Sequence, residues 1–291
     1  MQKFFYLAML LSALVVGACG APEQPAATNA APAAEPPAIA APAVEKSLAD
    51  VAAGEQRSAE NRARDVWRHP VETLEFFGLK PDSTVVEIWP AGGWYTEIIA
   101  PFVNDKGQYY AAHWDPNSET EFVRKGVEAF RDKLAADPDL YGNAKMTVLM
   151  PPDHWEIAPE GSADLVVTFR NIHNWLPRGF APEMFAAMYK ALKPGGVLGV
   201  VEHRGNPAVE QDPKAASGYV NEAYAIELAE AAGFVLDSKS EINANPADTK
   251  DYEAGVWTLP PTLREGDKDR EKYLAIGESD RFTLKFRKPA T

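Results

Sequence analysis

From residue 84 onward, short apolar runs alternate with amphipathic stretches. The runs are rich in β-branched residues and lack polar alternation, which is typical of parallel strands buried on both faces. They predict strands at 84–89, 108–113, 145–150, 163–169, 197–202, 234–242 and 281–288. Apolar residues at helical spacing between them predict helices from Trp94 to about 103, over 123–134 with Asn117 or Ser118 as cap, at 182–192 and at 218–232.

This alternation predicts an α/β fold with a doubly wound, mostly parallel, seven-stranded sheet. No full helix pattern separates the last two strands, so we expect an antiparallel addition at one edge. The intervening residues 243–280 are polar and turn-rich, which favours a lid or a wall on the substrate side; a disordered loop is the alternative. Ahead of the first strand, residues 47–83 predict an N-terminal helical cap with one helix over Ser47–Arg68 and a shorter one over 71–77.

The first eighteen residues have the pattern of a signal peptide. Lys3 is followed by an apolar run of about thirteen residues, which is shorter than the roughly twenty needed to span a bilayer. The run ends in Val-Gly-Ala before Cys19, which is the single cysteine of the chain, and this resembles a bacterial lipoprotein signal. The resemblance implies lipidation of Cys19, and Gly20 after it implies sorting to the periplasmic face of the outer membrane. An ordinary signal peptide is the alternative.

Residues 19–46 form the predicted tether between this anchor and the folded part. From Gly20 to Lys46 the chain has eleven Ala and six Pro and little to bury, so it cannot offset its ordering entropy. We therefore divide the chain into a signal peptide (1–18), the lipidated tether (19–46), the cap (47–83) and the main domain (84–291). The membrane contact expected is through Cys19 only.

The charge balance of the 291 residues excludes a polyanionic partner. The formal net charge is −13 and no Lys/Arg-rich run occurs, whereas nucleic acids are bound by clustered Lys and Arg. No Gly-Lys-Ser/Thr phosphate loop and no Gly-x-Ser-x-Gly nucleophile turn is present. Nucleic acid is therefore not expected as a partner, and neither of these two kinds of site is expected.

The stretch TVVEIWPAGGWYT at 84–96 predicts where a small, nucleotide-like ligand binds. A strand, a turn of small residues and a helix form the usual nucleotide-like pocket of an α/β sheet, with the acid Glu87 at the strand end. Glu87 can accept hydrogen bonds from an amine or hydroxyl of the ligand.

Three stretches together resemble one family. VVEIWPAGGWYT, ADLVVTFRNIHNW and LKPGGVLGVVEHR are similar to strand motifs of class I S-adenosylmethionine-dependent methyltransferases, and most like an exported bacterial group of predicted methyltransferases. The resemblance covers about residues 70–288 and implies a Rossmann-like methyltransferase fold with S-adenosylmethionine as cofactor. The cofactor-binding residues that it implies are Glu87, Trp89, Ala91, Gly92, Gly93, Tyr95, Thr96, His113, Asp115, Asp153 and His154.

The chain departs from the family pattern in two places, the loop after the first strand and the end of the second strand. Trp89 and Ala91 stand where the family has glycines, and because Trp cannot adopt positive φ cheaply, we expect the loop to take another path or to use Gly92. His113 stands where an acid should bind the ribose, with Asp115 two residues later. An imidazole bonds a hydroxyl less strongly than a carboxylate does.

Four of the five histidines follow predicted strands, where ligands bind in open α/β sheets. We predict His173 as a general base, with Arg170 and Asn171 orienting a polar or anionic substrate. A metal bound by ligands such as His113, His173 and His203 is a weaker alternative, because no tight ligand spacing supports it. Chance clustering in polar loops is equally consistent with the pattern.

The leading hypothesis is methyl transfer to an unknown small molecule by a lipid-anchored envelope protein. The runner-up is a degenerate methyltransferase-fold lipoprotein that binds another ligand or a protein partner, suggested by His113 and by the export signal. A pure interaction protein would have its pocket plugged above Gly92 and Gly93.

Overall fold

The computed structural model describes residues 46–290, all of which belong to one structural unit. The predicted signal peptide, Cys19 and the tether as far as residue 45 lie outside the described residues. Within the described part, no helix is both long and apolar enough to cross a membrane.

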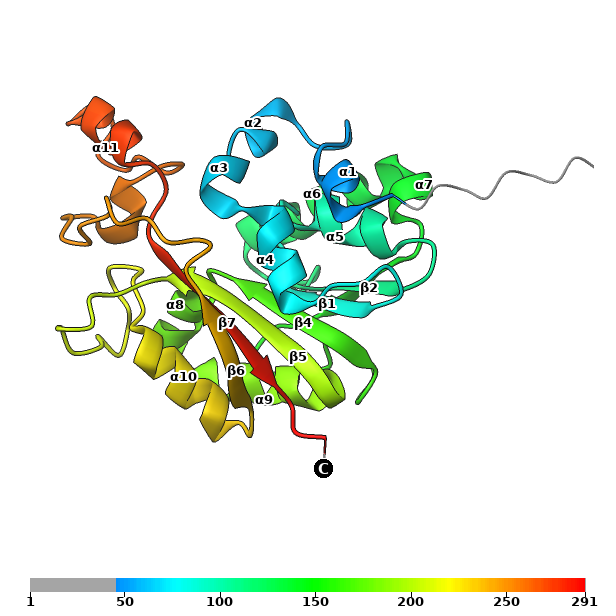
Figure 1. Ribbon diagram of the computed structural model, residues 1–291. Helices are drawn as coiled ribbons and strands as arrows, with labels where there is room; N and C mark the ends of the chain where they lie inside the picture. The colour runs from blue at the N-terminus through cyan, green and yellow to red at the C-terminus, as the bar shows by residue number, and fades with distance from the viewer. Residues whose placement is uncertain (1–45, 291) are drawn as a thin grey trace, which may run out of the picture. The chain divides into compact units, whose positions relative to one another are not determined.

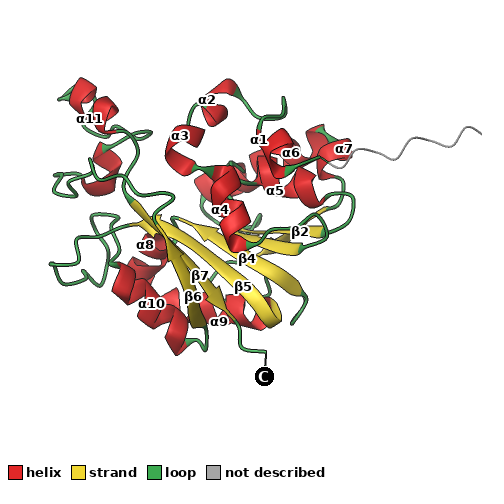
Figure 2. Ribbon diagram, viewed as in Figure 1, coloured by secondary structure: helices red, strands yellow, loops and turns green. Residues whose placement is uncertain are grey.

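A seven-stranded sheet forms the centre of this unit, as predicted (Figures 1 and 2). Its spatial order is β3-β2-β1-β4-β5-β7-β6, and the first five strands of the chain are parallel to one another. The strands are β1 (Thr84–Ile88), β2 (Gln108–His113), β3 (Ala144–Val148), β4 (Ala163–Phe169), β5 (Leu192–His203), β6 (Val235–Ser240) and β7 (Arg281–Arg287). This topology brings the carboxyl ends of β1, β4 and β5 side by side.

The last two strands add antiparallel pairing at one edge of the sheet, as predicted, with β7 on the inside and β6 on the outside. β7 pairs antiparallel with both β5 and β6 and lies between them. Its residues Phe282, Leu284 and Phe286 are fully buried, as a central position requires. β6 is the edge strand, and its polar sequence with alternating exposure suits that place.

Helices cover both faces of the sheet (Figure 1). One face carries the cap and α5 (Thr96–Val103), α6 (Glu121–Ala136) and α7 (Pro138–Tyr141). The other carries α8 (Ile172–Trp175), α9 (Ala181–Ala191) and α10 (Glu222–Ala231). The helix at 121–136 is preceded by Thr120 rather than by Asn117 or Ser118. Each face therefore has its own apolar cluster, as a doubly wound fold requires.

The predicted single helix over Ser47–Arg68 is broken into three short ones. These are α1 (Leu48–Ala52), α2 (Ala59–Arg62) and α3 (Asp65–Arg68), followed by α4 (Pro70–Phe77). Ser47 forms a capping box with Asp50, and Ser58 caps α2 by accepting from the amide of Asn61. Local capping thus starts a new helix where charge spacing alone suggested continuity.

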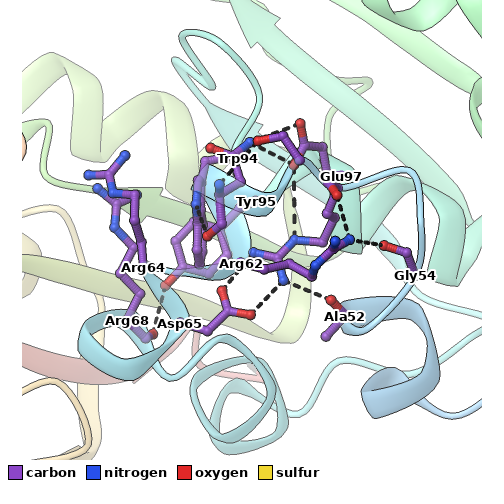
Figure 3. Close-up of polar contacts among 12 residues, drawn as sticks. Ala52, Gly54, Arg62, Arg64, Asp65, Arg68, Trp94, Tyr95 and Glu97 are labelled. Atoms are coloured by element: carbon purple, nitrogen blue, oxygen red, sulfur yellow. Dashed lines mark hydrogen bonds and ion pairs between the residues drawn. The ribbon is translucent and has the colours of Figure 1, made fainter.

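The cap is bonded to the start of α5 (Figure 3). Trp94 Nε1 donates to the carbonyl of Asn61 at 3.1 Å, and the Tyr95 hydroxyl donates to the carbonyl of Arg68 at 3.3 Å. The side chain of Asn61 in turn donates to the Glu97 carboxylate. These bonds hold α2 and α3 over the carboxyl end of β1.

The segment 243–280 leads from β6 back to β7 over the same rim. It contains a short 3-10 helix, Gly255–Thr258, and α11 (Arg270–Ile276). Its middle, including Trp257 and Pro260, forms one wall of a cavity beside the cap. The segment therefore lines a cavity, and its place on the substrate side stays a prediction.

Candidate functional site

The loop between β1 and α5 has positive φ at the three positions where the family pattern has glycines, although only one of the three is a glycine here. Trp89, Ala91 and Gly93 have φ of 45°, 52° and 81°, so the prediction that Trp89 avoids positive φ was wrong. Each non-glycine residue in this region costs roughly 1–2 kcal/mol. Hydrogen bonds offset the strain: Trp89 Nε1 donates to the Leu149 carbonyl at 2.9 Å, and the Ala91 carbonyl accepts from His113 at 3.1 Å.

Glu87 lies below this loop with one oxygen anchored. Its Oε2 accepts from Thr96 Oγ1 at 2.9 Å and from the Tyr109 hydroxyl at 2.6 Å. No described residue donates to Oε1, and Glu87 lines a cavity. Burial raises the pKa of Glu87 to about 7, against the two hydroxyl bonds, which lower it. The carboxyl group is thus available to a donor, and a cationic one would favour its ionised form.

His113, in the position of the ribose-binding acid, has both ring nitrogens occupied. Nδ1 accepts from the amide of Trp114 at 2.8 Å, so Nε2 is the donor to Ala91. Burial lowers the pKa of this imidazole, which keeps it neutral. Asp115 accepts from the amide of Asn117, and neither His113 nor Asp115 lines the cavities beside the loop. His113 therefore stabilises the loop through its two hydrogen bonds and offers no free ring nitrogen to a ligand.

Two cavities meet at the loop. We call the first the loop cavity. Its volume is about 530 Å³, and the residues that line it include Glu87, Trp89, Trp114, Phe122, Met150, Phe169 and Asn171. We call the second the arginine cavity. Its volume is about 430 Å³, and the residues that line it include Gly92, Arg64, Arg68, His173, His203, Trp257, Glu278 and Arg281. Pro90, Ala91, Trp94 and Arg170 line both and form the shared wall.

The remaining predicted cofactor residues are divided between core and surface. Tyr95 lines the loop cavity and stacks on Phe169 with ring centroids 3.5 Å apart. Asp153 and His154 are exposed, and the strand end before them contributes Met150 to the cavity instead. Gly93 packs close to Phe130, so a Cβ there would lie 3.1 Å from that ring. Gly92 has open space around its Cβ position.

Asn171 closes the floor of the loop cavity. Its amide nitrogen donates to the Ile88 carbonyl at 2.9 Å and to Thr168 Oγ1 at 3.2 Å. The side-chain oxygen accepts from no described residue, and Asn171 lines the cavity. Asn171 therefore joins the end of β1 to the end of β4 and leaves one acceptor toward a ligand.

His173 lies on the other side of the shared wall, paired with a buried carboxylate. Its Nδ1 lies 3.0 Å from Glu202 Oε1, and Glu202 also accepts from the amides of Ile172 at 2.6 Å and His203 at 2.8 Å. Since the carboxylate only accepts, Nδ1 carries the proton and Nε2 is left as a base. The arrangement is that of a histidine oriented by an acid for proton transfer.

His203 lies beside His173, with ring centroids 5.2 Å apart. Its Nδ1 bonds Ser279 Oγ at 2.5 Å. Burial, and next the nearby His173, hold the pKa of His203 well below its usual value, so it is neutral. Ligand atoms of His173, Glu202 and His203 lie within 4.8 Å of one another, whereas His113 is not part of this group.

Three arginines surround one acid in the arginine cavity. Glu278 accepts from Arg64 Nε at 2.6 Å, from Arg68 Nε at 2.9 Å and from Arg281. Burial alone would raise the pKa of Glu278, but Arg281, Arg68 and Arg64 lower it to about 2. The group is a desolvated ion cluster between α3 and the start of β7.

Arg170, on the shared wall, is different from these three. It follows β4 with φ of 60°, and no described residue accepts a hydrogen bond from its guanidinium. Burial, and next the charge of Arg281, lower the pKa of Arg170 to about 10. An arginine without a partner on a cavity wall is available to a ligand.

The charged residues of the arginine cavity, apart from Arg170, could not be predicted from the sequence. Arg64, Arg68, Glu278 and Arg281 were not candidates, because 210 residues separate Arg68 from Glu278 along the chain. The one local signal was the spacing of Glu278 and Arg281, three residues apart before a predicted strand.

Solved structures with the same fold are numerous, and the three described below are distant in sequence. A SAM dependent methyltransferase from Aquifex aeolicus matches with TM-score 0.51 and 17% identity, over 78% of this chain and 93% of that one. The [4+2]-cyclase SpnF matches with TM-score 0.52 and 17% identity, over 82% and 85%. Phosphoethanolamine N-methyltransferase 2 from Haemonchus contortus, in complex with S-adenosyl-L-methionine, matches with TM-score 0.50 and 18% identity, over 84% of this chain and 60% of that one.

No protein-family profile matches the chain, and no curated protein sequence matches it either. At these identities the structural similarity concerns the fold. The protein has the Rossmann-like, seven-stranded fold of class I methyltransferases.

Proposed function

We propose that the protein is an S-adenosylmethionine-dependent methyltransferase that acts on a small molecule. The observation that carries the proposal is the turn after β1, where Trp89, Ala91 and Gly93 all have positive φ above the half-open carboxyl group of Glu87. Such a turn at the carboxyl end of the first strand presents backbone groups to a nucleotide-like ligand. The similarity to methyltransferase structures supports the same ligand.

The loop cavity fits this cofactor at two of its parts. Oε1 of Glu87 is placed to accept from the amine of the methionine moiety. Trp114, Phe122 and Met150 offer an apolar surface to a base. The acid that usually binds the ribose is replaced by His113, and the polar groups on the loop cavity include the hydroxyl of Thr120 and the amide of Asn174. When bound, the cofactor supplies an electrophilic methyl group on a sulfonium.

The arginine cavity is the proposed acceptor side. His173 Nε2 would receive the proton of the acceptor, and Glu202 would stabilise the resulting imidazolium through Nδ1. The cap and Trp257 would limit the access of water. Methyl transfer needs mainly positioning, and because Ala91 and Arg170 line both cavities, the two ligands would lie next to each other.

The test is transfer of a labelled methyl group from S-adenosylmethionine to a small-molecule extract of the source envelope. We expect label in a low-molecular-weight product with the native protein and at least a tenfold slower rate with His173→Asn. Label that appears equally with both proteins would refute the role of His173. Absence of any labelled product, with proof that the cofactor binds, would refute the methyltransferase proposal for that extract's compounds.

A degenerate or repurposed pocket is the second candidate. It is favoured by His113, whose ring is committed to the loop where an acid would serve the cofactor, and the fold itself is shared with a cyclase. The test is His113→Asp. A gain of S-adenosylmethionine binding over an inert native protein would favour this candidate, and equal or weaker binding would count against it.

We also propose that Cys19 is lipidated and anchors the protein to the periplasmic face of the outer membrane. The support is the sequence pattern before this single cysteine. Mass spectrometry of the N-terminal peptide should show acyl chains on Cys19, and Cys19→Ser should release the protein into the soluble fraction. An unmodified cysteine on a mature chain would contradict the anchor.

A further inference from the structure

The arginine cavity has a large excess of positive charge. Arg64, Arg68, Arg170 and Arg281 line it, and Glu278 is the only carboxylate among its described lining residues. His203, also on its wall, is neutral because burial and the neighbouring His173 lower its pKa. In a protein with a net charge of −13, this concentration of guanidinium groups is local and specific.

Several donors of these arginines remain without a protein partner. Arg170 donates to no described residue, and Arg68 uses only its Nε, toward Glu278. Nε of Arg281 is buried and has no partner within the described chain. Buried or half-buried cations are costly unless they are paired. The pKa of Arg68 shows this cost, because burial, and next the charge of Arg170, lower it well below the usual value.

We propose that the arginine cavity binds an oxyanion group, a carboxylate or a phosphate, of the methyl acceptor, with Arg170 as its main ligand. Guanidinium groups match planar and tetrahedral oxyanions with paired hydrogen bonds, which makes them the usual choice for such ligands. The role of this ligand as methyl acceptor rests on the proposed function, whereas the oxyanion site follows from the charges and the unpaired donors of the cavity.

The other walls of the cavity indicate that the oxyanion belongs to an organic molecule. Val256, Trp257 and Pro260 form an apolar side, and Trp94 forms another. His173 lies on the same cavity, so a nucleophilic atom of a ligand anchored by Arg170 has a base within the same space. The ligand class is therefore a small organic acid or phosphate ester that carries a protic nucleophile.

The cofactor itself does not account for this charge. Its methionine moiety has one carboxylate, but its amine and sulfonium add two positive charges, and the open oxygen of Glu87 lies in the other cavity. A metal ion at His173, Glu202 and His203 is also a poor solution. His173 and His203 line the same cavity as the four arginines, and both Glu202 oxygens already accept hydrogen bonds.

The experiment is a calorimetric titration of the full-length protein with inorganic phosphate and, separately, with malonate. We expect at least one of the two to bind, and the stronger one identifies phosphate or carboxylate as the group recognised. Arg170→Gln should weaken that binding roughly tenfold to a hundredfold, because a hydrogen bond to a charged group is lost. Arg170→Lys should keep part of the affinity.

Arg131→Gln is the matched control. Arg131 is exposed on α6 and its replacement makes the same change in net charge, so binding should be unchanged. No binding of either probe, or an equal loss in Arg131→Gln and Arg170→Gln, would overturn the proposal.

Repeating the titration with saturating S-adenosylhomocysteine separates this inference from the proposed function. Unchanged oxyanion binding supports a separate acceptor site. Competition would mean that the arginines hold the carboxylate of the cofactor, and it would overturn the assignment. Oxyanion binding by a protein that does not bind S-adenosylhomocysteine would overturn the acceptor role and refute the proposed function, whereas failure of oxyanion binding alone leaves the latter intact.

Discussion

Nδ1 of His173 lies 3.0 Å from Oε1 of Glu202, a fully buried carboxylate near the end of β5. The same carboxylate accepts the amide of Ile172, so it fixes both the ring and the backbone at the start of α8. Two neighbouring parallel strands therefore fix the position of one imidazole. The pairing is possible because β4 and β5 lie next to each other and end at the same rim.

Replacing Glu202 with Gln should separate the orientation of the His173 ring from the binding of the cofactor. An amide can donate to Nδ1, which would move the proton of His173 to Nε2 and remove the base. We expect kcat for labelled methyl transfer to fall about a hundredfold or more, with S-adenosylhomocysteine affinity within about twofold of native. A loss confined to KM would contradict the positioning role of Glu202.

Glu87 should make stability depend on pH in an unusual direction. Its pKa in the folded protein is about 7, above the ordinary 4.5, so the native state holds a proton that the unfolded state has lost. The contribution of Glu87 to the free energy of unfolding therefore decreases as the pH rises from about 4.5 to about 7. Glu87→Gln should remove this decrease, as measured by urea unfolding across that range.

The exposed Glu72 on α4 provides the control for that series. Glu72→Gln should leave the pH dependence of the native protein unchanged. S-adenosylhomocysteine should also bind the native protein more tightly at pH 7.5 than at pH 6, because a cationic amine prefers the ionised carboxylate. A flat affinity profile for the native protein would show that Glu87 does not contact the amine.

Glu278 should have the opposite effect. Its pKa of about 2 lies below the ordinary 4.5, so its stabilising contribution is complete above about pH 4.5 and is lost as the pH falls toward 2. Glu278→Gln leaves three arginines without their shared acid and should cost about 3–5 kcal/mol at pH 7. Acid unfolding curves of the two proteins should converge at low pH, and parallel curves would contradict this role.

The strained turn makes a prediction that concerns stability alone. Ala91 has φ of 52°, so Ala91→Gly relieves backbone strain and should be neutral or stabilising by up to about 1 kcal/mol. Ala129, exposed in the middle of α6, is the matched control, and Ala129→Gly should destabilise by about 1 kcal/mol. Equal losses in thermal unfolding would show that the turn is not strained at Ala91.

The sheet could be predicted from the sequence because its strands are buried on both faces and are continuously apolar. β2 and β4 were predicted with their observed bounds. The position of β7 could not be predicted, since strand order depends on contacts between distant segments. The broken helix before Arg68 was missed because Ser58 competes locally as a cap.

The site was predictable only where strand ends define it. Glu87 and His173 were located by their place after apolar runs, whereas the partners that decide their chemistry, Tyr109 and Glu202, come from neighbouring strands. The positive φ of Trp89 could not be predicted, because the hydrogen bond to Leu149 that offsets its cost is a tertiary contact. The arginine cavity joins the cap to the last strand, which no local pattern reveals.

The most direct test of the account is a calorimetric titration of the purified full-length protein with S-adenosylhomocysteine at pH 7.5. The turn at Trp89–Gly93 and the open oxygen of Glu87 predict saturable binding with one site per chain, weakened about tenfold or more in Glu87→Gln and unchanged in Glu72→Gln. No heat of binding at millimolar ligand, with the fold intact, would contradict the assignment of the loop cavity as a cofactor site.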